Sequence, residues 1–149
     1  MAVKNLEVLA GGAEAFDVDG VFKAPLYYRQ VVAVHNADSI DFYISGVVGF
    51  SGSPTVEGDA FEQAMQTIAN IKCIVSAAAK HYGVSAENPL RYIVRTDADV
   101  FDHTNFSHVN RAYAESGMPM AARKMVPASA FPLGILVEIT PIARLPKQK

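Results

Sequence analysis

The apolar positions in the first part of the chain fall into short runs that are typical of β-strands. Runs rich in β-branched and aromatic residues occupy positions 18–24, 30–35 and 40–45, and we expect a strand in each. Residues 36–39 (NADS) have the chemistry of a hairpin turn between the last two. Residues 1–17 are expected to form a loosely structured lead-in, and the glycine-rich segment 46–58 is expected to be a loop.

The apolar spacing then changes to that of a helix. Large apolar residues recur every three or four positions from Phe61 to Val75, which predicts one apolar face on a helix of five or six turns. Asp59 is the expected N-cap, with Glu62 as its capping-box partner. The helix should end near residues 81–83, where Gly83 suits the position after the C-cap.

The pattern in the last third of the chain predicts a strand, a helix and then two more strands. We expect strands at 90–95, 122–126 and 135–142, and a helix over 104–116 that starts at Thr104 and stops at Gly117. A turn around Pro132 and Gly134 should join the last two strands. The order is therefore βββαβαββ, which indicates one α+β domain over residues 1–149, with two helices packed on one face of a mixed sheet.

Composition narrows the class of protein. Half of the 149 residues are apolar, 19% are charged and the net charge is −2, so the chain is neither disordered nor a basic nucleic-acid binder. No apolar stretch reaches the length of a membrane span, and the N-terminus makes a poor signal peptide. The single cysteine, Cys73, excludes an internal disulfide framework. We expect a cytoplasmic protein with no nucleic-acid or membrane partner.

A metal or cofactor site has weak support. Asp97, Asp99 and Asp102 precede His103, but their spacing is not that of a calcium loop, and a solvated turn before a helix accounts for them. The loop at 46–58 contains no phosphate-binding motif. The sequence therefore predicts no metal and no cofactor.

Two charged residues in apolar strands are the best candidates for chemistry. Arg123 and Glu138 both lie in otherwise apolar segments, where an ionised group is costly unless it is paired or used. If the strands at 122–126 and 135–142 pair with each other, Arg123 and Glu138 come within reach. One interpretation is a structural ion pair. The other is a cationic anchor for a substrate carboxylate beside a carboxylate that positions water.

The C-terminal segments resemble the signature of the RidA/YjgF family, the enamine/imine deaminases. The signature is matched by AARKMV at 121–126, FPLG at 131–134 and VEITPIA at 137–143, and the spacing from Arg123 to Glu138 is the family's. Further matches are Ser45-Gly46, Asn70-Ile71, and Val109-Asn110 followed by Tyr113. The resemblance covers about residues 20–145.

The resemblance implies a chorismate-mutase-like fold and a homotrimer with three sites at the subunit interfaces. By resemblance, Arg123 grips the carboxylate of a small-molecule substrate and Glu138 orients the attacking water. The other residues that the resemblance places in the pocket are Ser45, Gly46, Asn110 and Tyr28, with Tyr27 as the alternative to Tyr28. Met125 joins these candidates as a substrate-binding residue, because it shares a strand face with Arg123. No cofactor is implied.

The chain departs from the signature around its arginine, and this leaves alternatives for the function. Ala121, Lys124 and Met125 replace the family's Pro, Ser and frequent Cys, and Val47 replaces a frequent Gln. Met125 shares a strand face with Arg123, so we expect a bulkier and more apolar pocket wall. The leading hypothesis is an enamine/imine deaminase. The alternatives are a pathway-specific deaminase of the aminomuconate type, a non-catalytic small-molecule sensor on the same trimer and, disfavoured by the charge, an endoribonuclease or translation inhibitor.

Overall fold

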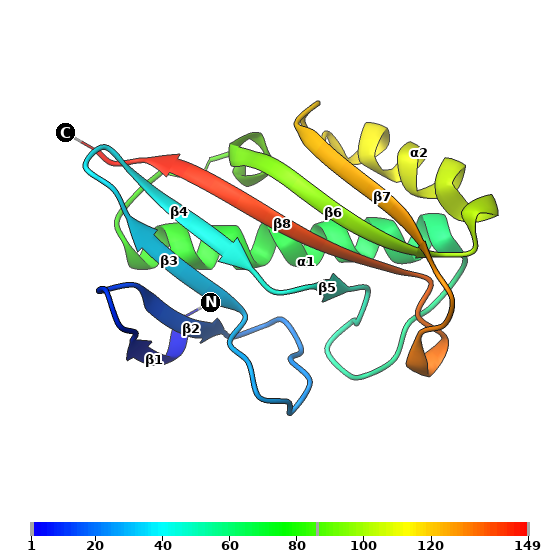
Figure 1. The fold of residues 1–149 in the computed structure, drawn as a ribbon, viewed down its shortest axis with the longest axis horizontal. Coiled ribbons are helices and arrows are strands. Elements are labelled where there is room, and N and C mark those ends of the chain that lie inside the picture. Colours follow the sequence, from blue (N-terminus) through cyan, green and yellow to red (C-terminus); the bar gives the residue numbers. More distant parts are fainter. Residues whose placement is uncertain (1, 86, 149) are drawn as a thin grey trace.

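A mixed β-sheet covered on one face by two helices forms the molecule. The computed structural model describes residues 2–85 and 87–148. In these residues the strands are β1 (Val3–Val8), β2 (Glu14–Val18), β3 (Val31–His35), β4 (Ser39–Ile44), β5 (Val47–Val48), β6 (Ile93–Phe101), β7 (Ala122–Ala128) and β8 (Val137–Pro146). The helices are α1 (Ala60–His81) and α2 (Phe106–Ser116), and the 3-10 turns are Pro89–Tyr92, His103–Asn105 and Pro132–Gly134. Figure 1 shows this sheet with α1 running across it.

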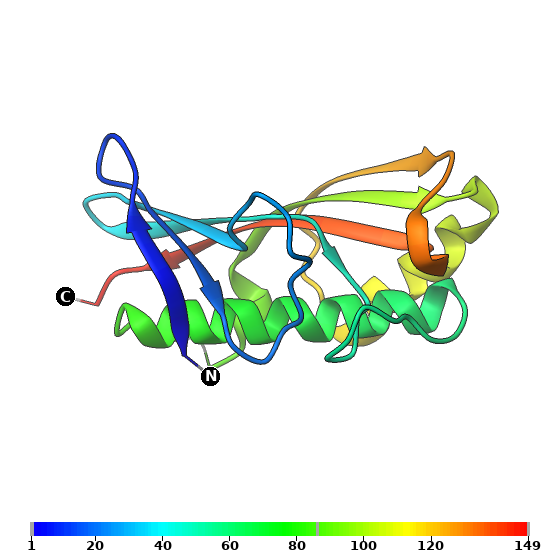
Figure 2. The same cartoon turned by 90° about the horizontal axis from the view of Figure 1, so that it is seen from below.

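The strands follow the order β1-β2-β3-β4-β8-β6-β7 across the sheet, and β5 pairs with the start of β8. All neighbours are antiparallel except β6 and β7, which run parallel and are connected by α2. Seen edge-on in Figure 2, both helices lie on the same side of the sheet. The predicted α+β class, with both helices on one face, is therefore confirmed.

The core lies between α1 and the sheet. The apolar face of α1, which includes Ile68, Ile71 and Val75, is buried against inward side chains such as Phe42 of β4 and Ile139 of β8. Alternate residues of the central strands point to the open face, where polar side chains are tolerated. One face of the sheet is therefore buried under the helices and the other is open, and only candidate side chains on the same face can come into contact.

The boundaries of α1 agree with the prediction. The side chain of Asp59 accepts a hydrogen bond from the Glu62 N–H and caps the first turn. Gly83 takes a φ of +66° directly after the C-cap, a conformation that glycine adopts without strain. Gly117 is itself the C-cap of α2 and also takes a positive φ, of +79°. The helix α2 itself begins at Phe106, because the residues expected as its first turn form a 3-10 turn capped by Asp102.

The N-terminal prediction needs correction. The expected lead-in 1–17 contains β1 and most of β2, and the strand expected over 18–24 is shifted, since β2 ends at Val18. The side chains of β1 are mostly exposed, so its sequence lacks the alternation of apolar and polar residues that predicts a strand with one buried face. The loop expected over 46–58 contains the short strand β5. The strand expected at 90–95 begins at Ile93 and runs on to Phe101.

The expected pairing of the last two strands is wrong. β6 lies between β7 and β8 and is hydrogen-bonded to both. Arg123 stands opposite Thr96, which stands opposite Pro141, whereas Glu138 stands opposite Asp99. Opposed residues share a face and successive residues alternate, so Arg123 and Glu138 point to opposite faces of the sheet. They form no ion pair within one chain.

No helix in residues 2–85 and 87–148 combines the length and the apolar character needed to cross a membrane.

Candidate functional site

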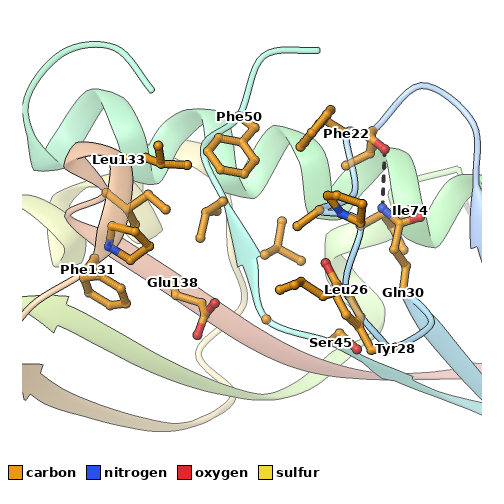
Figure 3. A pocket seen from close by; sticks show the side chains of 18 residues that line it. Phe22, Leu26, Tyr28, Gln30, Ser45, Phe50, Ile74, Phe131, Leu133 and Glu138 are labelled. Atoms are coloured by element: carbon orange, nitrogen blue, oxygen red, sulfur yellow. Dashed lines mark hydrogen bonds between the residues drawn. The ribbon is translucent and has the colours of Figure 1, made fainter. Parts of the chain in front are cut away.

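Glu138 lies beside a large cavity on one side of the molecule. The cavity has a volume of about 490 Å³ and is bordered by the segment between β2 and β3, by β5, by α1 and by the 3-10 turn before β8. Four of the residues predicted for the site meet here: Tyr28, Ser45, Gly46 and Glu138. Figure 3 shows Glu138, Ser45 and Tyr28 along one side, with Phe50, Leu133 and Phe22 across from them. Tyr27, the alternative to Tyr28, does not line this cavity and is fully exposed.

The carboxylate of Glu138 has an unusual environment. Among the residues that the structure describes, none donates a hydrogen bond to it and no cation forms an ion pair with it. Burial raises the pKa of Glu138, and the negative charge of Asp99, directly opposite on β6, raises it further. A carboxyl group with a raised pKa beside an apolar cavity binds a proton more tightly than an ordinary carboxyl group, which suits a group that accepts and returns a proton.

Gly46 allows the chain to pass close to this carboxylate. A Cβ atom at position 46 would lie 2.6 Å from Cδ of Glu138, much closer than atoms in van der Waals contact. The hydroxyl of Ser45 is already used, since it donates a hydrogen bond to the backbone oxygen of Arg29 at 2.7 Å. Ser45 therefore shapes the end of β4, while Gly46 leaves room for Glu138.

Two amides on α1 hold the cavity walls, and the sequence analysis did not assign them this role. Asn70 donates to the backbone oxygens of Val48 and Phe50, at 3.0 and 2.8 Å. Gln63 donates to the backbone oxygens of Gly58 and Gly134 and accepts from the N–H of Leu136. Asn70 is part of a match to the family signature, but that match does not predict its contacts to the backbone. Gln63 carried no signal, because a glutamine near a helix start is usually exposed.

Arg123 lies in a second hollow, on the helix side of the sheet. Phe106, Ser107 and Asn110 of α2 line this hollow together with Arg123 and Met125 of β7. Nη1 of Arg123 donates a hydrogen bond to Oδ1 of Asn110 at 2.9 Å, and its Cζ lies 5.3 Å from the ring centre of Tyr113. The Tyr113 hydroxyl is fixed in turn by a hydrogen bond to Thr96.

The guanidinium of Arg123 is exposed and oriented but has no anionic partner. The side chain is exposed, and within residues 2–85 and 87–148 it forms no ion pair with a carboxylate. A planar guanidinium held by a neutral amide keeps further N–H groups for a bidentate contact with an incoming carboxylate. The hollow can therefore bind a carboxylate but holds no general base.

The candidate residues thus form two separate groups in one chain. Tyr28, Ser45, Gly46 and Glu138 belong to the cavity, whereas Asn110, Arg123 and Met125 belong to the hollow. The side chains of Arg123 and Glu138 point to opposite faces of the sheet, so one chain does not bring these two groups together.

The acidic residues before α2 do not form a metal centre. Asp97 pairs with Arg95, and Asp102 accepts hydrogen bonds from Thr104. Nowhere in the described part of the chain do three His, Cys, Asp or Glu side chains gather as a metal site requires.

Comparison of the sequence with known proteins identifies related proteins. A family model described as Endoribonuclease L-PSP matches residues 22–145. A RutC family protein of Pyrococcus horikoshii is 35% identical over 89 residues, which is 59% of this chain and 64% of that protein, slightly less than two thirds of its length.

Solved structures agree in fold. RidA from the Antarctic bacterium Psychrobacter sp. is 29% identical with a TM-score of 0.67, covering 85% of this chain and 94% of that one. A Rid family protein of unknown function from Yersinia pestis is also 29% identical, with a TM-score of 0.70 and coverage of 89% and 98%. The chorismate-mutase-like fold expected from the resemblance is therefore confirmed, and the chain belongs to the Endoribonuclease L-PSP family, also known as the RidA/YjgF family.

Proposed function

We propose that this protein is a cofactor-independent enamine/imine deaminase of the cytoplasm. It hydrolyses a carboxylate-bearing imine to a keto acid and ammonia, at sites shared between the copies of a homotrimer. The observation that carries the proposal is Glu138, a carboxyl group with a raised pKa and no described partner, at the edge of a cavity that fits a small molecule. Family membership supports the same chemistry.

The site is completed by a second copy of the chain. The cavity supplies Glu138 but no cation to hold a substrate carboxylate, and the hollow supplies Arg123 but no base. Each group lacks what the other has. Placing the hollow of one copy against the cavity of the next gives a site with both functions, and closed cyclic symmetry repeats it in every copy.

The reaction needs few groups. Arg123 holds the substrate carboxylate in its guanidinium fork, with Asn110 fixing the orientation of that fork and Met125 forming an apolar wall. Glu138 accepts a proton from water as the water oxygen bonds to the iminium carbon. Glu138 returns this proton to the nitrogen of the resulting carbinolamine, the C–N bond breaks, and the hydroxyl gives its proton to the departing ammonia, so that the carbon becomes a ketone. Iminium and water thus give keto acid and ammonium, with no oxidant or reductant involved.

The remaining pocket residues position this water. Gly46 gives the carboxylate of Glu138 its space, and the ring of Tyr28 borders the same region. Burial raises the pKa of Tyr28, so its hydroxyl stays protonated at neutral pH and can donate a hydrogen bond.

The test measures ammonia and keto acid released from freshly generated 2-aminoacrylate and related imines. Wild type should exceed the spontaneous rate, and Glu138→Gln should lower kcat by about 100-fold or more. Arg123→Ala should mainly raise KM, because it removes the carboxylate anchor. Each variant must keep the wild-type mass in solution.

Arg123→Ala also tests the earlier ion-pair interpretation. Since Arg123 is exposed and its partner is the neutral Asn110, we expect little change in the free energy of unfolding. Carboxylate binding by the wild type with no acceleration of any imine would contradict the deaminase and indicate a binding protein instead. A solution mass near 16.0 kDa would contradict the shared site.

A further inference from the structure

The guanidinium of Arg123 has space on two sides. Arg123 and Asn110 border the hollow described above, and they also border a neighbouring hollow of about 650 Å³ between the second half of α2, the segment before β7 and the start of β6. Arg123 is exposed, and within residues 2–85 and 87–148 no carboxylate fixes it by an ion pair. An arginine side chain has many rotamers, so the affinity for a ligand falls by the free energy needed to order it.

Two side chains of α2 contact this guanidinium. Asn110 and Tyr113 lie three residues apart on the helix, so they share the face that looks towards β7. Oδ1 of Asn110 accepts a hydrogen bond from Nη1 of Arg123 at 2.9 Å, which fixes one edge of the guanidinium. The ring centre of Tyr113 lies 5.3 Å from Cζ, within the distance at which an aromatic ring attracts a cation. Together the amide and the ring restrict a rotation that one hydrogen bond alone permits.

The ring of Tyr113 is itself held in place. Tyr113 is 7% exposed and Thr96 is 2% exposed, and the tyrosine hydroxyl donates a hydrogen bond to Oγ1 of Thr96 at 2.9 Å. Thr96 stands directly opposite Arg123 in the ladder between β6 and β7. The three residues therefore form a closed circuit of contacts, in which the sheet sets the position of the ring relative to the arginine. Burial raises the pKa of Tyr113, so its hydroxyl remains a donor at neutral pH.

We propose that Tyr113 is a positioning residue for the carboxylate anchor: its ring holds the guanidinium of Arg123 in one orientation, with the free N–H groups available to an incoming carboxylate. The inference rests on the proposed function, because Arg123 binds the substrate carboxylate there. Tyr113 acts through Arg123 and not on the reacting atoms.

The test replaces the ring of Tyr113 and measures both binding and turnover. In Tyr113→Leu the Kd for pyruvate, the keto acid released from 2-aminoacrylate, should rise about 3- to 10-fold, because ordering one long side chain on binding lowers affinity by about that factor. In turnover of 2-aminoacrylate, KM should rise by a similar factor and kcat should stay nearly unchanged, since Glu138 is not disturbed. Tyr113→Phe keeps the ring and loses only the hydrogen bond to Thr96, so its Kd should stay close to the wild-type value.

Tyr82→Leu is the control for the loss of a packed ring. The ring of Tyr82 packs against Phe16 of β2 and Phe42 of β4, in the half of the sheet remote from β7. This variant should lower the melting temperature but leave the Kd for pyruvate unchanged, and both leucine variants must keep the wild-type mass in solution. A Kd that rises equally in Tyr82→Leu and Tyr113→Leu would indicate a general loosening of the fold and would overturn the inference.

The order of the arginine side chain can also be measured without any ligand. The NMR order parameter of the Arg123 Nε–H bond should be high in the wild type and in Tyr113→Phe, and it should fall in Tyr113→Leu. An unchanged order parameter in Tyr113→Leu would contradict the positioning role. A Kd as high in Tyr113→Phe as in Tyr113→Leu would contradict it as well, because the hydroxyl and not the ring would then carry the effect.

These measurements separate the inference from the function on which it rests. If Tyr113→Leu weakens the binding of pyruvate but the wild type hydrolyses no imine, the deaminase fails and the positioning role stands. If the wild type is an active deaminase and Arg123→Ala raises KM but Tyr113→Leu does not, the deaminase stands and the positioning role fails.

Discussion

Gly46 and Gly49 lie three residues apart in the chain, yet they approach very different atoms. A Cβ at Gly46 would meet the side chain of Glu138 at 2.6 Å, whereas a Cβ at Gly49 would lie 2.7 Å from the backbone oxygen of Gln63 in α1. A carboxylate side chain can rotate away, but a helix backbone cannot. Gly46→Ala should therefore lower kcat by about 10-fold or more with little change in stability, because a displacement near 1 Å at the reacting group has that effect.

Gly49→Ala serves as the matched comparison. It should lower the free energy of unfolding by about 1–3 kcal/mol, the usual range for overpacking. Urea denaturation and kcat of the folded fraction separate the two effects. If Gly46→Ala were as unstable as Gly49→Ala, or fully active, the added Cβ would not be accommodated by displacement of the Glu138 side chain.

Asp99 influences the proton affinity of Glu138. The two carboxylates are direct cross-strand neighbours on β6 and β8, and repulsion adds to the rise in the pKa of Glu138 that burial causes. Asp99→Asn removes the repulsion, so the pKa of Glu138 should fall while staying above its ordinary value. The base proposed above must be ionised to act, so under that proposal the rise of kcat/KM with pH should move to lower pH in Asp99→Asn.

Asp97→Asn is the control for this shift. Asp97 lies two residues earlier on the same face of β6, pairs with Arg95 and stands opposite Thr140. It should leave the midpoint of the pH profile in place. A profile that moves equally in both variants would mean that the general field of the sheet, and not Asp99, sets the pKa of Glu138.

Single residues were predicted well where their own chemistry was the signal. A carboxylate and an arginine within apolar segments stood out, and the family signature identified both residues and Gly46. The distance between Arg123 and Glu138 was predicted wrongly, because alternation along each strand says which face a residue takes only when the neighbouring strand is known.

At the scale of elements, Asn70 connects α1 to the strand β5. It is 7% exposed, and its amide satisfies two backbone oxygens that border the cavity. Asn70→Ala leaves both oxygens without this donor and should cost about 1–3 kcal/mol of unfolding free energy in urea. Asn70→Asp should cost more at pH 7, since a carboxylate would then face two carbonyl oxygens.

Lys72→Ala is the control on the same helix. Lys72 is exposed, so its replacement should change stability by no more than about 0.5 kcal/mol. A cost for Asn70→Ala as small as that for Lys72→Ala would show that water replaces the amide, and that the position of β5 does not depend on it.

The elements themselves were predictable where caps and periodicity agreed. Asp59 and Gly83 mark both ends of α1 by local chemistry alone. The pairing of β7 was missed although the pattern contained it: a strand, a helix and a strand in succession favour parallel neighbours, as β6, α2 and β7 are. The exposed strand β1 gave no periodic signal, so its pairing with β2 could not be predicted from hydrophobicity.

At the scale of the whole molecule, the opposed positions of Arg123 and Glu138 have a consequence for assembly. A protein that uses both groups on one substrate must take them from different copies. The two single variants Arg123→Ala and Glu138→Gln then damage different halves of each site. A site is intact wherever an Arg123→Ala copy supplies Glu138 and a Glu138→Gln copy supplies Arg123.

Mixed assemblies of these two variants should therefore regain activity that neither has alone. If the variants are co-expressed in equal amounts, each required copy is present with a probability of one half, so about a quarter of the sites should be intact. Mixing either variant with the double variant should restore nothing, since the double variant supplies neither group. Differently tagged copies and the mass in solution verify that mixed trimers have formed. Mixed trimers without recovered activity would place the reaction within one chain, where the sheet separates the two groups, and would therefore remove Arg123 or Glu138 from the chemistry.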